Sequence, residues 1–275
     1  MLGHVEQIPP EIVRHYQTID EGVRITEGPG RLERQRTQDI VSRFLPSRRC
    51  SVLDVGGATG VHASWLASLG HDVHVVDLLA HHVAAASQLS APPGRVTAEV
   101  GDARRLPVAD AAFDVVLLFG PLYHLTDRAD RLRAWEEARR AVRPGGMVFA
   151  GAISRFASVF DGLARGYLLD PAFRAIVQRD LRDGQHRNPS DQPHWFTTAF
   201  FHHPDELRSE ALEAGVDVLE VVGVEGLAGW LTHVCDQWDR PEVRDAMVFA
   251  AAAVESEPSL LGLSAHLITV GQRPS

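Results

Sequence analysis

The segment Val52-Leu53-Asp54-Val55-Gly56-Gly57-Ala58-Thr59-Gly60 decides the fold of this chain. It is a short apolar run that leads into a glycine-rich turn, and a later apolar run, Val73-His74-Val75-Val76-Asp77, ends in an acid. Glycine lets backbone N–H groups come close to a ligand because it has no Cβ. An amphipathic helix between the two runs completes a βα unit, which predicts a nucleoside site at the carboxyl ends of parallel strands.

The spacing of the glycine-rich turn discriminates between cofactors. The dinucleotide fingerprint G-x-G-x-x-G, counted from Gly56, requires glycine where this chain has Ala58 and Val61. A nicotinamide enzyme would also place no acid such as Asp54 so close to its diphosphate. A phosphate-binding P-loop is excluded because the chain contains no lysine. A carboxylate suits a cationic ligand without phosphate, and S-adenosylmethionine carries a sulfonium and an α-ammonium group.

Several motifs in a fixed order resemble those of class I S-adenosylmethionine-dependent methyltransferases. Asp54 to Gly60 is similar to the family's first motif, D/E-x-G-x-G-x-G, with Ala58 at the middle glycine. An acid after the third apolar run, a fourth apolar run with its loop, and a helix-to-strand turn then follow at Gly101-Asp102-Ala103, Phe113 to Leu125 and Arg143-Pro144-Gly145-Gly146. Four motifs in register over roughly 100 residues are more specific than the glycine turn alone.

The resemblance implies S-adenosylmethionine as the cofactor and S-adenosylhomocysteine as the product. On the matching positions Asp77 would bind the ribose, Leu78 would pack on the adenine, and Asp102 would meet the adenine amino group. Backbone carbonyls after the fourth strand would bind the methionine ammonium. The cofactor-binding residues expected from the motifs are Asp54, Gly56, Gly57, Ala58, Gly60, Asp77, Leu78, Asp102, Ala103, Phe119 and Gly120.

The methionine carboxylate needs a cationic partner, which these motifs lack. The helix predicted from Leu32 to Phe44 carries Arg34 and Arg36, and either could reach over the glycine turn. A bidentate arginine fits a carboxylate. A surface salt bridge is the alternative for each residue, and we expect Arg36 to be the ligand.

His124 is the candidate catalytic residue. It lies in Pro121-Leu122-Tyr123-His124-Leu125, after the fourth strand, where the acceptor approaches the methyl group in the family that the chain resembles. Histidine has an unperturbed pKa of ~6.5 and can accept a proton at neutral pH. Methyl transfer itself requires alignment and exclusion of water, so a base is optional. The alternative is that His124 only orients its loop by hydrogen bonding.

The alternation of helix and strand predicts a Rossmann-like α/β fold with helices on both faces of a mostly parallel sheet. The expected strands and helices of the core are 51–55, 72–77, 95–100, 113–119 and 146–153, and 60–69, 80–89 and 127–142. The resemblance implies seven strands, the last of which, 264–270, is antiparallel. We expect a single domain whose parts are an N-terminal helical segment, a cofactor-binding core, an inserted helical cap and the C-terminal part of the core sheet with a helical insertion, at residues 1–45, 46–153, 154–203 and 204–275.

The expected cap contains two groups of side chains that invite a functional interpretation. Its histidines match no zinc spacing, so we expect no metal and interpret them as unrelated surface residues, not as a pocket lining: His186, His194, His202 and His203. Its aromatic residues are interpreted as the core of the cap, the alternative being a lid over a flat acceptor: Trp195, Phe196, Phe200 and Phe201.

The composition bounds the class of protein. The chain has 275 residues, of which 45% are hydrophobic and 23% charged, as in an ordinary globular protein. Its net charge of −9 argues against a general nucleic-acid surface. Cys50 and Cys235 form no CxxC pair, the start from Met1 to Glu6 lacks a signal-peptide pattern, and no apolar run is long enough to span a bilayer. These features predict a cytoplasmic protein, and abundant arginine without lysine is typical of a GC-rich bacterial genome.

The expected function is methyl transfer from S-adenosylmethionine to a small-molecule acceptor, with the methylated atom, O, N or C, left open. No RNA-binding module fits beside the core, so the acceptor is the expected partner, without nucleic acid or membrane, and a homodimer is compatible with these features. Two alternatives stay open. One is a non-catalytic S-adenosylmethionine-binding protein, and the other is a nicotinamide-dependent oxidoreductase, which the loop spacing disfavours.

Overall fold

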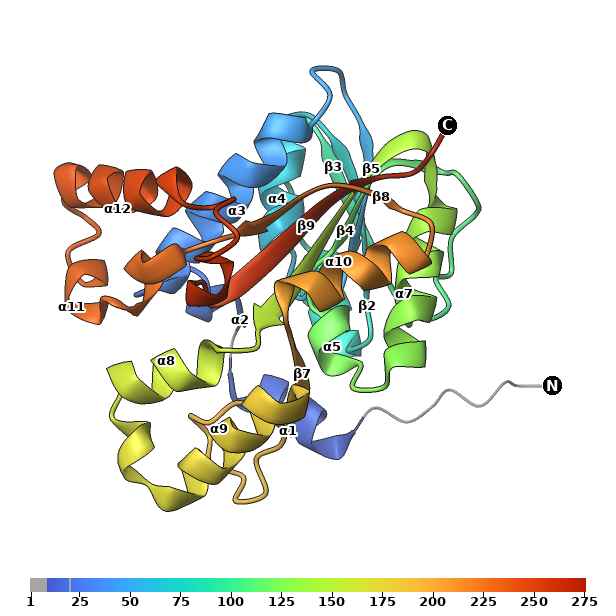
Figure 1. The fold of residues 1–275 in the computed structure, drawn as a ribbon. Coiled ribbons are helices and arrows are strands. Elements are labelled where there is room, and N and C mark those ends of the chain that lie inside the picture. Colours follow the sequence, from blue (N-terminus) through green and yellow to red (C-terminus); the bar gives the residue numbers. More distant parts are fainter. Residues whose placement is uncertain (1–8, 20) are drawn as a thin grey trace.

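β1 lies in the interior of the sheet, and its residues Val52 to Val55 are all buried. The structure is a computed structural model that describes residues 9–19 and 21–275. β2 and β4 flank β1 in parallel, β3 lies beyond β2, and β5 lies beyond β4 (Figure 1). The bounds are Ser51–Val55 for β1, Asp72–Asp77 for β2, Arg95–Val100 for β3, Phe113–Leu118 for β4 and Val142–Ser154 for β5. The first three agree with the predicted strands, whereas β4 ends one residue earlier than predicted, and β5 begins four residues earlier and ends one residue later.

Antiparallel pairings complete the sheet on the other side of β5. β9 (His266–Gln272) lies antiparallel to β5, and β8 (Asp217–Gly223) lies antiparallel to β9. The expected antiparallel last strand is therefore confirmed, although it begins two residues later than the prediction of 264–270.

The expectation of seven strands is wrong, because the sheet has nine. The additional strands are β7 (Ala199–His202) and β6 (Gln185–His186), and both come from the cap. β5 continues past Ala150, the last residue that pairs with β4, and β7 pairs with the edge that is left open at Ile153 and Ser154. The cap is thus attached to the core by backbone hydrogen bonds as well as by side chains.

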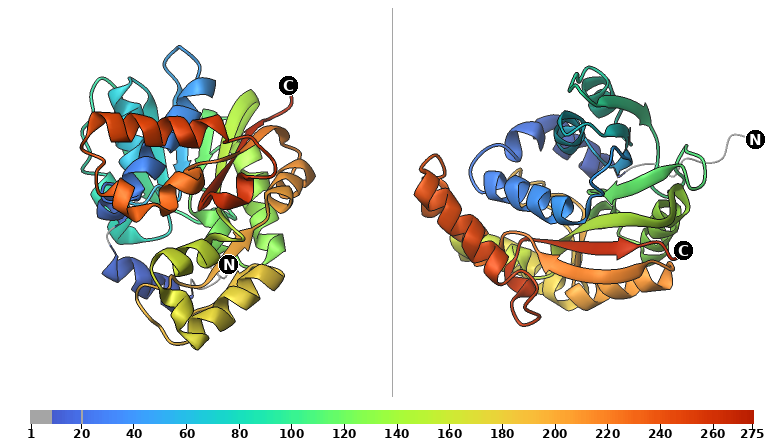
Figure 2. Two further views of the ribbon diagram at one scale, coloured as in Figure 1. Left: turned by 60° about the vertical axis from the view of Figure 1, so that its left-hand side comes forward. Right: turned by 90° about the horizontal axis from the view of Figure 1, so that it is seen from above.

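Helices cover both faces of the sheet, as predicted (Figure 2). Leu53 of β1 packs on the face under α7 and α10, and its neighbour Val52 packs on the face under α3, α4 and α5. Successive strand residues point to opposite faces, so one apolar run supplies two cores. The helix bounds are Gly30–Phe44 for α3, Val61–Ser68 for α4, Ala80–Ala86 for α5, Arg128–Ala141 for α7 and Pro204–Glu213 for α10.

The cap lies at the end of the molecule toward which the parallel strands run, beside the N-terminal helices (Figure 1). Phe173 packs against Trp195, and Phe201 packs against Phe196. Trp195, Phe196 and Phe201 therefore pack inside the cap, as expected, whereas the Phe200 ring lies under the guanidinium of Arg131, whose Cζ is 3.6 Å from the ring centroid. The elements at this end are α1 (Pro10–Thr18), α2 (Glu21–Arg24), the short α6 (Pro121–His124) after β4, α8 (Ala157–Ala164), the 3-10 turn η1 (Tyr167–Leu169) and α9 (Pro171–Asp183).

The segment between β8 and β9 is helical but broken into pieces. It comprises η2 (Gly226–Trp230), α11 (Thr232–Cys235), α12 (Pro241–Ala253) and η3 (Leu261–Leu263). α12 packs against α3 on the outside of the sheet (Figure 2).

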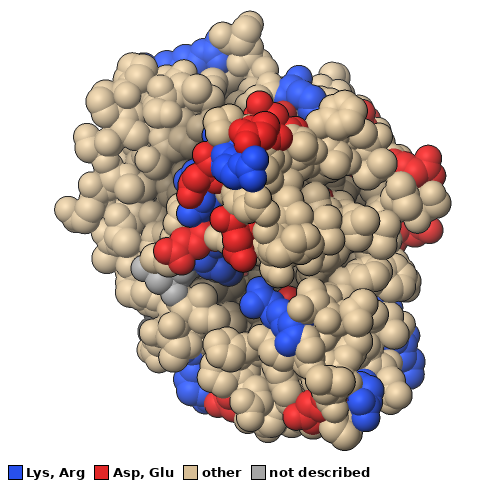
Figure 3. All heavy atoms as spheres, turned by 90° about the vertical axis from the view of Figure 1, so that its left-hand side faces the viewer, with Lys and Arg blue, Asp and Glu red and all other residues tan. Residues whose placement is uncertain are grey.

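The surface of the described chain bears on two of the expectations from the sequence. None of the described helices is both long and apolar enough to cross a bilayer. On the face in Figure 3, arginine and carboxylate side chains lie among one another, so that face carries no patch of a single sign. The N-terminal stretch from Met1 to Glu6, in which no signal pattern was found, lies outside the described residues.

Candidate functional site

A cavity of about 420 Å³ lies at the carboxyl ends of β1, β2 and β4, and we call it the strand-end cavity. Open parallel sheets bind ligands at this position. Eleven residues predicted from the sequence line it: Asp54, Gly56, Gly57, Ala58, Asp77, Leu78, Asp102, Ala103, Phe119, Gly120 and His124. The motifs that are separate in the sequence are therefore brought together around one space.

The glycine turn is shaped first by contacts within the protein. Gly56 has a φ of +74°, and a Cβ there would lie 2.6 Å from Pro121 Cδ and 2.7 Å from the Phe119 carbonyl oxygen. A Cβ on Gly57 would lie 2.6 Å from a carboxylate oxygen of Asp54. Glycine is therefore required at both positions before any ligand binds.

The remaining two positions of the turn differ from the expectation. Ala58 has a φ of +47°, which is costly for a residue with a Cβ, and its N–H donates to Asp77 Oδ2 at 3.0 Å. Gly60 was expected to contact the cofactor, but the structure corrects this expectation because Gly60 does not line the cavity. It precedes α4 with a φ of +86°, and a Cβ there would lie 2.5 Å from Leu89 Cδ1.

Asp54 has the most unusual environment in the strand-end cavity. Its side chain is fully buried, and neither carboxylate oxygen has a hydrogen-bond partner among the described residues. Burial, together with the nearby negative charge of Asp77, raises the pKa of Asp54 to about 7. A buried carboxylate without a partner is costly, and a bound cation that donates hydrogen bonds would remove that cost.

Asp77 connects the glycine turn to the next helix. Its Oδ2 accepts from Ala58 N, and its Oδ1 accepts from Leu79 N at 2.9 Å. His82 Nδ1 lies 3.1 Å from the same Oδ1. A carboxylate has about four acceptor positions, so Asp77 can still accept hydrogen bonds from ribose hydroxyls.

Asp102 lies in the cavity wall, but its carboxylate is already paired. Arg104 NH2 donates to Asp102 Oδ2 at 2.6 Å, and Arg104 NH1 donates to Asp130 Oδ2 at 3.0 Å. Burial alone would raise the pKa of Asp102, but the hydrogen bonds and charge of Arg104 lower it overall. Contact between Asp102 and an adenine amino group therefore remains a prediction, and it requires sharing the carboxylate with Arg104.

The expectation that Arg36 binds the methionine carboxylate is corrected by the structure, because Arg36 does not line the cavity. Its guanidinium is buried, pairs with Glu255 beyond α12, and donates from Nε to the Val224 carbonyl oxygen at 3.3 Å. Arg34, the other residue considered, does not line the cavity either. α3 is oriented about its axis so that Arg36 faces the C-terminal helices, because α3 packs against α12.

Arg24 of α2 is the cation that the sequence analysis missed. Arg24 and Arg104 are the arginines that line the strand-end cavity in the described chain. Arg24 pairs bidentately with Glu33, with NH1 to Oε2 at 2.7 Å and NH2 to Oε1 at 2.9 Å. Burial would raise the pKa of Glu33, but Arg24 and His266 lower it to about 2. No motif marks Arg24, so only the folding of α2 over the cavity reveals it.

His124 lines the strand-end cavity, and both of its ring nitrogens have partners. Tyr16 Oη lies 2.6 Å from Nε2, and the Thr198 carbonyl oxygen lies 3.4 Å from Nδ1. Burial lowers the pKa of His124 to about 4. The imidazole is therefore neutral at physiological pH. Tyr16, on α1, is a further residue that the sequence analysis did not single out.

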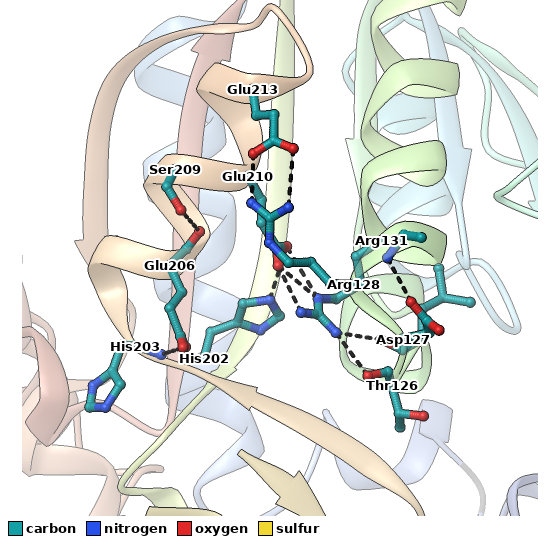
Figure 4. Close-up of polar contacts among 12 residues, drawn as sticks. Thr126, Asp127, Arg128, Arg131, His202, His203, Glu206, Ser209, Glu210 and Glu213 are labelled. Carbon is teal, nitrogen blue, oxygen red and sulfur yellow. Dashed lines mark hydrogen bonds and ion pairs between the residues drawn. The ribbon is translucent and has the colours of Figure 1, made fainter. Parts of the chain in front are cut away.

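A buried ionic network holds the loop that follows His124 (Figure 4). Arg131 of α7 donates from NH1 to the carbonyl oxygens of Leu125 at 3.0 Å and Thr126 at 3.2 Å. Its Nε and NH2 pair with Glu210 of α10, whose Oε2 lies 3.3 Å from His202 Nε2 of β7. The loop is thereby tied to both the C-terminal part of the sheet and the cap.

Two of the cap histidines are not surface residues, which corrects the expectation for them. His202 and His186 are buried, with exposed fractions of 0% and 1%. His186 Nδ1 lies 2.8 Å from Asp180 Oδ2, and its Nε2 lies 2.8 Å from the Trp195 carbonyl oxygen. Each histidine therefore pairs with a carboxylate inside the protein and stabilises the cap.

A second cavity of about 600 Å³, which we call the cap cavity, adjoins the first. Both cavities are lined by Tyr16, Arg24, Glu33 and Tyr123. Six aromatic residues of the cap and η2 line the cap cavity, together with small, apolar and charged residues from other segments: Tyr167, Phe173, Trp195, Phe196, Phe201 and Trp230. If each cavity held a ligand, the two ligands would come together at these four shared residues.

Charged groups that compensate one another lie on one side of the cap cavity. His266 Nδ1 lies 2.5 Å from Glu225 Oε1, and Ser264 Oγ donates to Glu225 Oε2 at 2.7 Å. Burial would lower the pKa of His266, but Glu33 and Glu225 raise it to about 9. The ligand atoms of Glu33, Glu225 and His266 lie within 4.8 Å of one another, as a metal site would require, but in this structure they form ion pairs with Arg24 and with each other.

Comparison of the sequence with known families and proteins identifies related methyltransferases. Residues 52–146 match the family model described as Methyltransferase domain. Methyltransferase GfsG of Streptomyces halstedii is 28% identical over 68% of this chain and 60% of its own length. The 27-O-demethylrifamycin SV methyltransferase of Amycolatopsis mediterranei is 31% identical over 54% of this chain and 53% of its own length. The chain thus spans about half of the length of these relatives, or slightly more.

Solved structures share the fold over most of the chain. The PH0226 protein of Pyrococcus horikoshii has a TM-score of 0.61 at 15% identity and covers 94% of this chain and 98% of its own. The cyclase SpnF has a TM-score of 0.54 at 19% identity and covers 88% of this chain and 80% of its own. At such identities the likeness shows the fold alone, and the same fold carries more than one reaction.

Proposed function

We propose that this chain, which belongs to the class I S-adenosylmethionine-dependent methyltransferases, transfers the methyl group of S-adenosylmethionine to a small-molecule acceptor. The observation that carries the proposal is Asp54. It is a buried carboxylate without a hydrogen-bond partner among the described residues, and it lines a cavity at the strand ends. A phosphate would be repelled there, whereas the methionine ammonium would supply the missing donors.

The residues around the strand-end cavity fit the rest of the cofactor. In this proposal Arg24, which lines the cavity, binds the methionine carboxylate once it shares or leaves Glu33, and Asp77 accepts from the ribose hydroxyls. Leu78 and Ala103 offer apolar surface to the adenine, and the carbonyl oxygens of Phe119 and Gly120 are further candidates to accept from the ammonium. When bound, S-adenosylmethionine supplies a methyl group on a sulfonium leaving group. The protein has to align the acceptor and exclude water.

The cap cavity is proposed to bind the acceptor. Its volume of about 600 Å³ is within the range of sites for drug-sized ligands, and its aromatic walls suit an apolar compound. The name of the rifamycin methyltransferase refers to a small-molecule acceptor, which is consistent with this class of substrate. Shared lining residues would bring the acceptor next to the transferable methyl group.

Calorimetry with S-adenosylhomocysteine and with NAD tests the cofactor. We expect S-adenosylhomocysteine to bind and to raise the melting temperature by mass action, and NAD to do neither. NAD binding without a response to S-adenosylhomocysteine would favour the oxidoreductase instead. A screen of metabolites with methyl-labelled cofactor then tests catalysis, because a sensor protein would bind the cofactor and transfer no label.

The remaining properties of the chain are also proposals. We propose a cytoplasmic, bacterial enzyme of a single domain with divisions near residues 46, 154 and 204, that acts on its acceptor without nucleic acid or membrane. Cys50 and Cys235 are both free and buried, which is consistent with a reducing compartment. A homodimer is included in the proposal, and light scattering of the purified protein would test it.

A further inference from the structure

Tyr16 lies where the two cavities meet, whereas His124 lines the strand-end cavity and is not among the residues that line the cap cavity. Tyr16 comes from α1 and His124 from α6, so the pair forms only when the N-terminal helix packs across the strand ends. Their rings meet edge to face, with centroids 5.4 Å apart. An acceptor in the cap cavity would therefore lie next to Tyr16, and the hydroxyl of Tyr16 lies within hydrogen-bond distance of His124.

The hydrogen bond between these residues has a defined direction. The Thr198 oxygen next to Nδ1 is a backbone carbonyl and can only accept, so Nδ1 carries the proton of the neutral ring. Nε2 is then the acceptor, and Tyr16 Oη donates to it at 2.6 Å. A phenol can accept a hydrogen bond at its oxygen while its own proton is donated.

The surroundings of His124 keep it uncharged before reaction. Burial of the ring is the main cause of the lowered pKa of His124, and the hydrogen bond to the Thr198 oxygen and the charge of Asp77 across the cavity oppose it. The other neighbours of the ring are aromatic, namely Phe196 from the cap and Tyr123. A neutral imidazole with an acceptor nitrogen is the form that a general base requires.

We propose, on the basis of the proposed function, that Tyr16 and His124 form a proton relay and that the methylated atom of the acceptor is a hydroxyl oxygen. The acceptor oxygen bonds to the methyl carbon while the carbon–sulfur bond breaks, and that electron pair stays on sulfur. The hydroxyl proton passes to Tyr16 Oη as Tyr16 passes its own proton to His124 Nε2. The imidazolium then releases one proton to solvent, so the sulfonium charge is balanced.

A hydroxyl acceptor needs this relay more than an amine does. A methylated amine is stable as an ammonium ion and can lose its proton later in water. A methylated hydroxyl that keeps its proton is a strongly acidic oxonium, so the proton has to leave during the transfer. Even a base whose pKa has been lowered to about 4 by burial is sufficient for such a proton. The aromatic walls of the cap cavity further indicate that the hydroxyl belongs to a flat, mostly apolar compound.

The test compares Tyr16→Phe, His124→Asn and His124→Gln with the wild-type protein and with His233→Asn, a control on exposed α11. Methyl-labelled S-adenosylmethionine is supplied with 1-naphthol, 2-naphthol and 1-hydroxyanthraquinone, and with 1-naphthylamine as the matched amine. We expect label on oxygen, a kcat about 10²-fold lower in the relay variants, and no change in the control. Calorimetry should show the affinity for S-adenosylhomocysteine within about threefold of wild type in every variant, because the relay acts on the proton and not on cofactor binding.

A second readout does not depend on turnover. The ¹⁵N chemical shifts of His124 in protein loaded with S-adenosylhomocysteine should show a neutral ring protonated at Nδ1 at pH 7, and Tyr16→Phe should change the Nε2 shift. A ring protonated at Nε2, a kcat of Tyr16→Phe within threefold of wild type, or label only on nitrogen or on no compound would overturn the relay. Parallel loss of turnover and cofactor affinity would also overturn it, because the pair would then only hold α1 in place. Failure of the wild-type protein to bind S-adenosylhomocysteine would instead overturn the proposed function, and the relay with it.

Discussion

The two cavities share four lining residues but are built in different ways. The strand-end cavity is formed mainly by short segments that end neighbouring strands, and it contains Asp54, a carboxylate that no described residue compensates. The cap cavity is formed by segments from α1 to β9, and its charges are compensated by pairs such as His266 with Glu225. The first cavity therefore selects a ligand by charge, whereas the second is suited to select by shape and apolar surface.

The largest effect is expected from removing the uncompensated charge. Asp54→Asn should weaken binding of S-adenosylhomocysteine by about 3 kcal/mol, or about 10²-fold, because the ligand ammonium loses its counter-charge. The same variant should stabilise the ligand-free protein at pH 8 by on the order of 2 kcal/mol, because it removes a buried charge. Calorimetry and thermal unfolding measure these effects, and Asp72→Asn, in an exposed ion pair with Arg49, is the control. Unchanged affinity would contradict the role of Asp54.

The same residue predicts how binding depends on pH. The pKa of Asp54 is raised from 3.8 to about 7 in the folded protein, so the carboxyl group is increasingly protonated and neutral below pH 7. The affinity for S-adenosylhomocysteine should therefore rise about tenfold from pH 6 to pH 8. The stability of the ligand-free protein should change in the opposite sense, falling as the pH rises from about 4 to 7, because the folded state holds the proton more tightly than the unfolded state. A pH-independent affinity would show that Asp54 does not contact the ammonium.

Arg24 connects the two cavities, and replacing it should have the next largest effect. Arg24→Gln should weaken S-adenosylhomocysteine binding by about 1.5–3 kcal/mol, the usual contribution of a hydrogen bond to a charged group. Binding of 5′-methylthioadenosine, which lacks the amino-acid part, should not change. Arg34→Gln, outside both cavities, serves as the control in the same calorimetric titrations. Equal weakening of both ligands would mean that Arg24 shapes the site and does not bind the carboxylate.

The compensated charges of the cap cavity should appear in stability and not in cofactor affinity. The pKa of His266 is raised to about 9, so its ion pairs stabilise the fold below its unfolded pKa of 6.5 and lose that contribution as the pH rises through 9. His266→Gln should lower the free energy of unfolding by about 1–3 kcal/mol at pH 6 and flatten its decline from pH 7 to 10. Urea denaturation measures this, with exposed His233→Gln as the control. If the free energy of unfolding of His266→Gln declined as steeply with pH as that of the wild type, the decline would come from groups other than His266.

The smallest effect concerns the departure from the family motif. Ala58 has a φ of +47°, so Ala58→Gly should relieve backbone strain and raise the free energy of unfolding by about 0.5–1 kcal/mol. S-adenosylhomocysteine affinity should stay within about twofold, because the N–H of residue 58 still donates to Asp77. A substantial change in affinity on calorimetry would show that the alanine methyl group contacts the ligand.

Local sequence patterns were sufficient for the strand-end cavity because each motif lies at the end of a strand. In a parallel sheet all such ends lie on one edge, so residues far apart in sequence, such as Asp54 and Asp102, converge once the strand order is known. The same reasoning gave the alternation of helices and strands, since it depends on hydrophobic period and turn residues. The sequence motif assigned a cofactor contact to Gly60 that the structure does not show. Glycine is needed there because Leu89 packs against it.

The tertiary structure alone decided the contacts that depend on how helices are rotated and docked. Arg36 and Arg24 are both arginines on N-terminal helices, and only packing turned the first toward Glu255 and brought the second to the cavity. The pairing of Tyr16 with His124, 108 residues apart, has no local signal. Strands β6 and β7 likewise depend on the tertiary structure. β5 extends beyond the end of β4 and leaves an edge with which β7 pairs, and β6 pairs with β7. Short-range patterns fix which face of a segment is apolar, whereas the partner of that face depends on the whole fold.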